Sequence, residues 1–161
     1  EGASIKNNTF LPKLEKGPDI FIECIKHLKS KHKNIKVLLT GLRRQYVQKE
    51  LKKINVPYYY FEMCDFETLN ELYNCLDLYI VGSRVEGGPR AINECALTKT
   101  PLLSTDVGIS SLICHPESIF KIDYPHTILS SIHNVEYNYN ECLKYTIKNY
   151  MKTFTYKLLN D

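Results

Sequence analysis

Short apolar runs alternate along the chain with longer segments whose apolar residues recur every three or four positions. The runs predict β-strands, and the longer segments predict amphipathic helices. The predicted strands are Thr9–Leu11, Ile35–Thr40, Val56–Phe61, Leu76–Val81, the apolar run after Pro101, and Ile119–Ile122. The predicted helices are Pro18–Leu28, Gln45–Ile54, Glu67–Leu76, Pro89–Thr98, Pro125–His133 and Tyr139–Leu159. This alternation predicts a parallel, doubly wound (Rossmann-like) α/β sheet with helices on both faces.

The segment Ser83–Glu94 lies between a predicted buried strand and a predicted helix. Gly87 and Gly88 supply backbone freedom for a turn, and Pro89 is expected at the first helical position. In an open α/β sheet, anionic ligands bind where a strand leads into the N-terminus of the following helix. The sequence therefore predicts a ligand site at this turn.

Two carboxylates, Glu86 and Glu94, flank the turn. Because helical side chains lean toward the helix N-terminus, Glu94 is expected to point to the same mouth that Glu86 lines. Carboxylates at this spacing can accept hydrogen bonds from vicinal hydroxyls, for example on a sugar and on a ribose. The free amides near Arg90, Ala91 and Ile92 are expected to receive a phosphate, and the Arg90 guanidinium adds positive charge.

The Glu-x7-Glu spacing, the preceding serine, the Glu-Gly-Gly-Pro turn and the later segment Pro101–Gly108 form a larger pattern. Together they resemble the nucleotide-sugar domain of retaining GT-B glycosyltransferases of the glycosyl group 1 type. The resemblance covers Lys13–Ile122, and its most specific part is Asp77–Gly108. It implies the donor-binding, C-terminal half of an enzyme that transfers a hexose from a UDP- or GDP-sugar to a hydroxyl acceptor.

By this resemblance, Glu86 and Lys16 are the candidate catalytic residues. Glu86 would hold hydroxyls of the transferred sugar near the reacting carbon, and Lys16 would neutralise the departing diphosphate. The expected donor-binding residues are Gly41, Met63, Cys64, Gly87, Gly88, Arg90, Ala91 and Glu94, with Met63 and Cys64 at the nucleobase and Glu94 on the ribose. No metal or other cofactor is implied, because the chain has no Asp-x-Asp cluster.

The chain departs from the family pattern at three places. Phe10 and Leu11 stand where the family has a Gly-Arg pair whose arginine shares the diphosphate. Lys13 can supply charge nearby, but as a point donor and not as a two-pronged fork. Lys99 stands where the family has a glycine in left-handed conformation, a replacement that costs about 1 kcal/mol if the backbone is kept. The acidic residue that often follows Gly108 is missing.

Composition and charge argue against other classes of function. Lys and Arg number 21 against 18 Asp and Glu, and a net charge of +3 without a compact basic block gives no reason to expect nucleic acid. No apolar run reaches transmembrane length. Six cysteines without a Cys-x2-Cys pair predict reduced thiols in a cytoplasmic protein. The length fits one donor-binding domain, residues 1–161, whose N-terminal acceptor-binding partner domain would precede it.

Other interpretations of the same residues remain open. A nucleotide-sugar epimerase would bind the same donor and cleave it without an acceptor. A non-catalytic binding module is favoured by the missing arginine and by the changed loop after Gly108. An ordinary strand–turn–helix with two solvated glutamates needs no ligand. A flavodoxin-like receiver is disfavoured, because the chain lacks a cluster of acidic residues at its strand ends.

Overall fold

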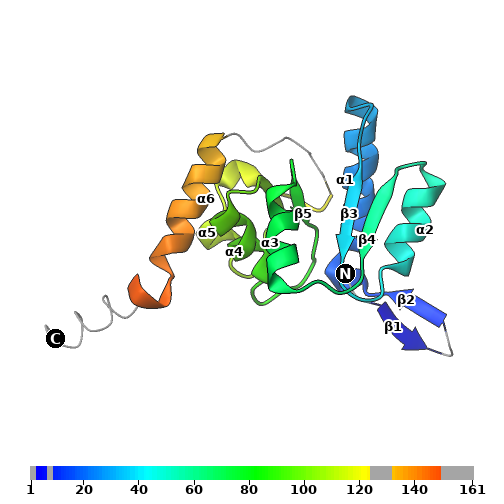
Figure 1. Ribbon diagram of the computed structural model, residues 1–161, viewed down its shortest axis with the longest axis horizontal. Helices are drawn as coiled ribbons and strands as arrows, with labels where there is room; N and C mark the ends of the chain where they lie inside the picture. The colour runs from blue at the N-terminus through cyan, green and yellow to red at the C-terminus, as the bar shows by residue number, and fades with distance from the viewer. Residues whose placement is uncertain (1–2, 7–8, 124–131, 150–161) are drawn as a thin grey trace, which may run out of the picture.

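The computed structural model describes residues 3–6, 9–123 and 132–149, and its parallel strands form two sheets (Figure 1). In the first sheet, β3 (Val37–Thr40) pairs with β4 (Tyr58–Phe61), with Val37 opposite Tyr58. In the second, the order is β5 (Tyr79–Val81), β6 (Leu102–Thr105) and β7 (Ile119–Phe120). All neighbours in these two sheets are parallel. The predicted parallel α/β fold is therefore confirmed.

Helices connect the parallel strands. α2 (Gln45–Lys53), α3 (Phe66–Asn74), α4 (Arg90–Thr98) and the short α5 (Ser110–Ile113) follow β3, β4, β5 and β6 in turn. The short 3-10 helix η2 (Pro116–Ser118) leads into β7. The 3-10 turn η1 (Leu14–Lys16) and α1 (Pro18–Lys31) precede β3, and α6 (Ile132–Lys144) follows β7. Side-chain capping fixes one of these starts, since Asp65 accepts a hydrogen bond from the Thr68 amide at 2.7 Å before α3.

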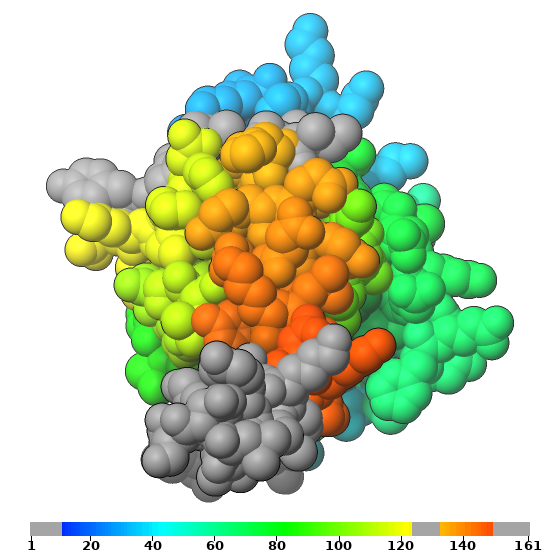
Figure 2. All heavy atoms as spheres, turned by 90° about the vertical axis from the view of Figure 1, so that its left-hand side faces the viewer, coloured from blue at the N-terminus to red at the C-terminus, as the bar shows by residue number. Residues whose placement is uncertain are grey.

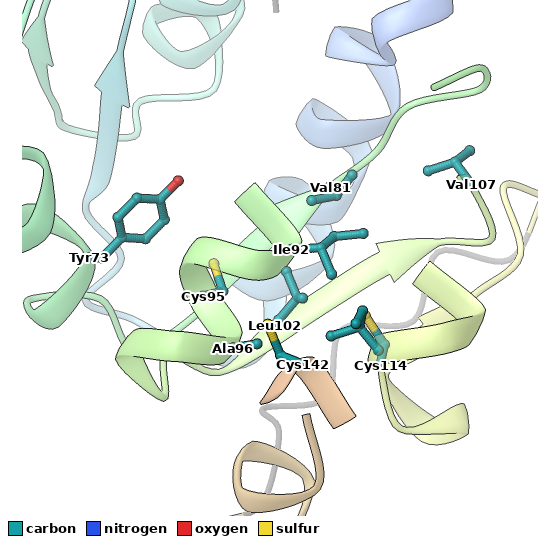
Figure 3. Packing of buried hydrophobic residues seen from close by; sticks show 10 residues of the cluster. Tyr73, Val81, Ile92, Cys95, Ala96, Leu102, Val107, Cys114 and Cys142 are labelled. Atoms are coloured by element: carbon teal, nitrogen blue, oxygen red, sulfur yellow. The ribbon is translucent and has the colours of Figure 1, made fainter. Parts of the chain in front are cut away.

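Strand β6 is buried on both faces. Successive side chains of a strand point to opposite sides, so its two leucines pack on different neighbours. Leu102 packs with Ile92 and Cys95 of α4, as Figure 3 shows. Leu103, next in sequence, packs instead with Ile20 of α1 and with Phe120. Helices thus cover both sides of this sheet, and every residue of β6 is buried for that reason.

Helix α1 packs against both sheets, and a cleft lies between them. Its residues Ile22 and Ile25 join the core around β3, whereas Ile20 and Cys24 join Leu103 of β6. The cleft has a volume of about 620 Å³ and is lined by residues of β3, β5, α1 and α3. Lys16 and Tyr73 are among the lining residues.

The predicted first strand is present, but its pairing is different from the expected parallel arrangement. β2 (Thr9–Pro12) pairs antiparallel with β1 (Ala3–Lys6), so that Ala3 lies opposite Pro12. This hairpin lies beside α2, apart from the parallel sheets (Figure 1). An apolar run predicts a strand but not its partner. Pairing with the adjacent segment closes a much shorter loop than pairing with β3 or β5 would.

The C-terminal helix begins earlier in the chain than predicted. α6 runs from Ile132 to Lys144, whereas the sequence predicts Tyr139–Leu159. Its inward face carries the buried polar residues Asn134 and Asn138, which do not register in a hydrophobic pattern. Residues of the predicted helix beyond 149, and most of Pro125–His133, lie outside the described residues. Figure 2 shows α6, in orange, lying across the outer side of this half of the molecule, where it packs on α4 and α5.

The six cysteines are free thiols, as predicted. Cys24, Cys95, Cys114 and Cys142 are buried, and burial raises the pKa of the Cys24 and Cys114 thiols to about 12. Among the helices that the structure describes, none combines the length and the apolar character needed to cross a bilayer.

Candidate functional site

Three turns meet at the carboxyl ends of β5 and β6: residues 13–17, 82–89 and 105–109. Gly17 has φ 60°, and a Cβ there would lie 1.7 Å from the carbonyl oxygen of Gly82. Gly108 has φ 53°, and a Cβ there would lie 2.6 Å from the carbonyl oxygen of Gly87. Both positions require glycine, because the backbones approach too closely for any side chain. The middle turn is therefore held between the other two.

Hydrogen bonds hold the middle turn in place. The amides of Arg84 and Val85 donate to the carbonyl of Glu15 at 2.8 and 3.2 Å. On the other side, the Thr105 hydroxyl donates to the carbonyl of Ser83 at 2.5 Å. Ser83, the serine that precedes Glu86 in the sequence pattern, is itself buried. The loop that carries Glu86 thus has a fixed backbone at its start.

The two predicted catalytic residues, Lys16 and Glu86, form an ion pair. The Lys16 Nζ lies 2.5 Å from Glu86 Oε2, across 70 positions of sequence. Their side chains are 34% and 26% exposed, so both remain open to a ligand. The structure therefore brings a cation and a carboxylate together where the three turns meet.

A second ion pair beside this one involves residues that the sequence analysis does not single out. Arg84 Nη1 and Nη2 donate to the two carboxylate oxygens of Asp19, at 2.8 and 2.6 Å. Nη1 also donates to the carbonyl of Leu14 at 2.6 Å. The hydrogen bond from Arg84 is the main cause that lowers the pKa of Asp19. The one available signal was the position of Arg84, directly after the serine of the pattern.

Glu94 is held by a buried tyrosine. The Tyr73 hydroxyl of α3 donates to Glu94 Oε2 at 2.6 Å, and Tyr73 is only 7% exposed. Its ring stacks on Tyr79 with 5.5 Å between centroids. Burial raises the pKa of Tyr73 and raises that of Tyr79 to about 12, so both phenols stay protonated at neutral pH. The helical spacing of Leu69, Leu72, Tyr73 and Leu76 predicts that Tyr73 faces inward, but it does not reveal the partner of the hydroxyl.

Helix α4 begins one residue later than predicted. Pro89 is its N-cap, with ψ 115°, and Arg90 is the first helical residue. The amide of Ile92 donates to the carbonyl of Pro89 at 3.0 Å, so it is not open to a phosphate. Arg90 and Ala91 keep the first two helical amides, whose N–H groups have no carbonyl partner within the helix. Arg90 is exposed and Ala91 half-buried.

The sequence predicts a turn that needs the backbone freedom of Gly87 and Gly88, but the observed turn does not need it. Neither has a positive φ, so their conformational freedom is not required here. A Cβ on Gly87 would meet nothing within 4 Å, and one on Gly88 would only touch Ile109 at 3.9 Å. Their small size leaves open space beside Glu86, which a ligand can fill.

The remaining predicted donor residues lie at the ends of the other sheet. Gly41 follows β3, and its carbonyl accepts a hydrogen bond from the Tyr60 hydroxyl at 2.9 Å. Met63 is 77% exposed and Cys64 half-buried in the loop after β4. No role of Gly41, Met63 or Cys64 is tested by this geometry, and their assignment stays a prediction.

The departures from the family pattern have two different outcomes. Lys99 has φ 55° at the end of α4, so the left-handed backbone is kept there without glycine. Its Nζ pairs with Glu136 at 2.8 Å and lies 4.7 Å from the centre of the Tyr139 ring. Leu11, at the position of the missing arginine, is 42% exposed on β2.

Fold and site together define a Rossmann-like α/β domain whose candidate site lies at the carboxyl ends of its parallel strands. The chain belongs to the glycosyl transferases group 1 family, whose sequence profile matches residues 9–134. The match includes all the candidate site residues, from Lys16 to Glu94. No curated protein matches the chain. Membership of this family supports glycosyl transfer as the type of reaction.

Proposed function

We propose that this chain is the donor-binding domain of a retaining glycosyltransferase, which transfers a hexose from a UDP- or GDP-sugar to a hydroxyl acceptor. The observation that carries the proposal is the Lys16–Glu86 ion pair, with its nitrogen and oxygen 2.5 Å apart. In the proposal the cation is for the diphosphate and the carboxylate is for the sugar hydroxyls, and the match to the glycosyltransferase family supports these roles.

The proposed roles follow from charge. The leaving nucleoside diphosphate gains negative charge in the transition state, and a preorganised cation that meets this charge lowers the barrier. Lys16 supplies that cation, and Arg90 with the first amides of α4 adds positive potential. Glu86 accepts hydroxyls of the transferred sugar, and Glu94 accepts those of the ribose. In this proposal Lys16, Arg90 and the first amides of α4 supply the positive charge, and no metal ion is needed.

In this proposal the acceptor is bound by an N-terminal partner domain. Transfer depends on holding donor and acceptor together and on excluding water. The chain by itself is therefore expected to bind donor weakly and to transfer sugar negligibly. We place the enzyme in the cytoplasm, where free thiols such as the exposed Cys75 stay reduced.

A non-catalytic nucleotide-sugar-binding module is the second candidate. The exposed Leu11, at the position of the expected arginine, favours it. Transfer activity of a protein that joins this domain to its acceptor-binding half would distinguish the two candidates.

Ligand-observed NMR with UDP, GDP and ADP at millimolar concentration tests the proposal directly. We expect one of these nucleotides to bind, and Lys16→Met to weaken its binding. Lys26→Met is the matched control, because Lys26 forms a comparable ion pair with Glu23 at 2.6 Å on the exposed face of α1. Absence of binding for every nucleoside diphosphate would overturn the proposal.

A further inference from the structure

We propose that Arg84 and Asp19 are positioning residues that set the geometry of the Lys16–Glu86 ion pair for the donor diphosphate. This inference deepens the proposed function and rests on it. Neither residue touches the ligand in this scheme. Both act through the two turns that carry Lys16 and Glu86.

Arg84 joins three parts of the chain with one side chain. Its guanidinium takes both carboxylate oxygens of Asp19, in the first turn of α1, at 2.8 and 2.6 Å. The same side chain takes the carbonyl of Leu14, at the start of η1, at 2.6 Å. A planar fork with several N–H donors is suited to this task, whereas a lysine is a single point donor.

The backbone repeats the same connection. The amides of Arg84 and Val85 both donate to the carbonyl of Glu15, the neighbour of Lys16. Lys16 therefore lies between two anchored positions, Glu15 and Asp19. Glu86 follows the anchored pair Arg84–Val85 directly in sequence. Side chains whose backbones are fixed on both turns lose little further freedom when they meet a ligand.

The competing explanation is that the Arg84–Asp19 pair only stabilises the fold. A pair of which each side chain is 35% exposed contributes modestly to stability, because water screens it. The two explanations differ in what they predict for Lys16, so the test has to read out Lys16 itself.

The first experiment is a double-mutant cycle on nucleoside diphosphate binding. Arg84→Gln removes the fork while keeping much of the side chain, and Asp19→Asn removes its charged partner. Each is expected to weaken the affinity for UDP or GDP about tenfold, the scale of one charge-assisted contact. Combined with each other, or with Lys16→Met, they should cause little further loss. Glu136→Gln, which breaks the exposed pair with Lys99, is the control and should leave affinity unchanged.

The second experiment needs no nucleotide. An amine-acylating reagent, read out by mass spectrometry, reports how freely the Lys16 amine leaves its ion pair. We expect Lys16 to be labelled severalfold faster in Arg84→Gln than in the unmodified chain, with Lys26 labelling unchanged. Circular dichroism confirms that each variant is folded.

The outcomes separate this inference from the proposed function. If a nucleotide binds but Arg84→Gln leaves both its affinity and Lys16 labelling unchanged, the positioning role is wrong. The positioning role is also wrong if Arg84→Gln weakens nucleotide binding by the same factor in the unmodified chain and in the Lys16→Met variant. If Lys16 labelling responds but no nucleotide binds, positioning of the ion pair stands and the proposed donor fails.

Discussion

Glu86 and Glu94 belong to one short segment, but the structure holds them in two different ways. Glu86 lies in a loop and pairs with a charged residue, Lys16, that is 34% exposed. Glu94 lies on a helix and accepts a hydrogen bond from Tyr73, which is only 7% exposed. A charged partner can be shared with an incoming anion. A buried neutral phenol leaves the carboxylate charge in place and fixes its direction.

In the proposed function, the two ends of the segment have different tasks. At the Glu86 end, the ion pair can rearrange when a diphosphate brings its own negative charge next to Lys16. At the Glu94 end, one carboxylate oxygen accepts the hydrogen bond of a buried phenol, which fixes the direction of the side chain. Such a residue suits a part of the donor that does not change during the reaction.

The largest expected effect tests whether the Glu94 end is anchored in the core and the Glu86 end is not. Ile92 of α4 is 0% exposed, whereas Val85 beside Glu86 is 70% exposed. We expect Ile92→Ala to cost about 2–5 kcal/mol of unfolding free energy, since it leaves a cavity. Val85→Ala should stay within about 0.5 kcal/mol. Urea denaturation of both variants measures this, and equal losses would show that the two ends do not differ in anchoring.

The next effect tests the tasks of the glutamates in a protein that joins this domain to its acceptor-binding half. If Glu94 grips ribose, its contact is similar in ground and transition states, so Glu94→Gln should raise the donor KM. If Glu86 touches sugar near the breaking bond, Glu86→Gln should mainly lower kcat. A charged hydrogen bond is worth about 1.5–3 kcal/mol, which corresponds to changes of about tenfold to a hundredfold. Wild-type kinetics in both variants would make the glutamates ordinary surface residues.

Much of this comparison could be predicted from the sequence, because its pattern is local. The strand before Ser83, the helix after Pro89 and the inward face that carries Tyr73 all follow from short-range periodicity. The meeting of Lys16 with Glu86 followed only from resemblance to a family. Nothing in the spacing of the two residues relates them across the intervening chain.

The parts that could not be predicted depend on pairing in space. The hydroxyl of Tyr73 finds Glu94, and Arg84 finds Asp19, only once α3 and α1 are docked. The strand Thr9–Leu11 was recognised, but its antiparallel partner was not, since β-propensity does not specify a neighbour. Asn138 is almost fully buried, and its side-chain oxygen accepts a hydrogen bond from the His115 amide at 2.7 Å, which makes the burial tolerable. A polar residue in that role interrupts the apolar pattern from which a helix is predicted.

A smaller effect concerns the phenol that holds Glu94. The pKa of Tyr73 is raised mainly by burial, so the folded state keeps this proton at pH values where the unfolded chain loses it. Stability from this source is complete below about pH 10 and falls as pH rises above it. Tyr73→Phe should lower stability at neutral pH by about 1.5 kcal/mol, the low end for a hydrogen bond to a charged group. Its alkaline loss of stability should be less steep than that of the unmodified chain. Thermal melts between neutral and alkaline pH measure both, and parallel curves would contradict the assignment.

The smallest expected effect lies at the far end of the helix that carries Glu94. Lys99 adopts φ 55°, which costs a residue with a Cβ about 1 kcal/mol relative to glycine. Lys99→Gly removes that cost but also loses the exposed pair with Glu136 and the contact with the Tyr139 ring. Both contacts are exposed and screened by water, so together they only offset the gain from relieving the strain. The substitution by itself should therefore change the unfolding free energy by less than about 0.5 kcal/mol.

The same substitution becomes informative once the ion pair is gone. In a Glu136→Gln background only the ring contact opposes the relief of strain, so Lys99→Gly should be more favourable to stability there than it is alone. Urea titrations of the four proteins in the cycle measure the difference. If Lys99→Gly destabilises the chain equally in both backgrounds, the ion pair contributes nothing and loss of the ring contact outweighs any cost of the left-handed backbone. The glycine found in the family would then have no energetic advantage over Lys99.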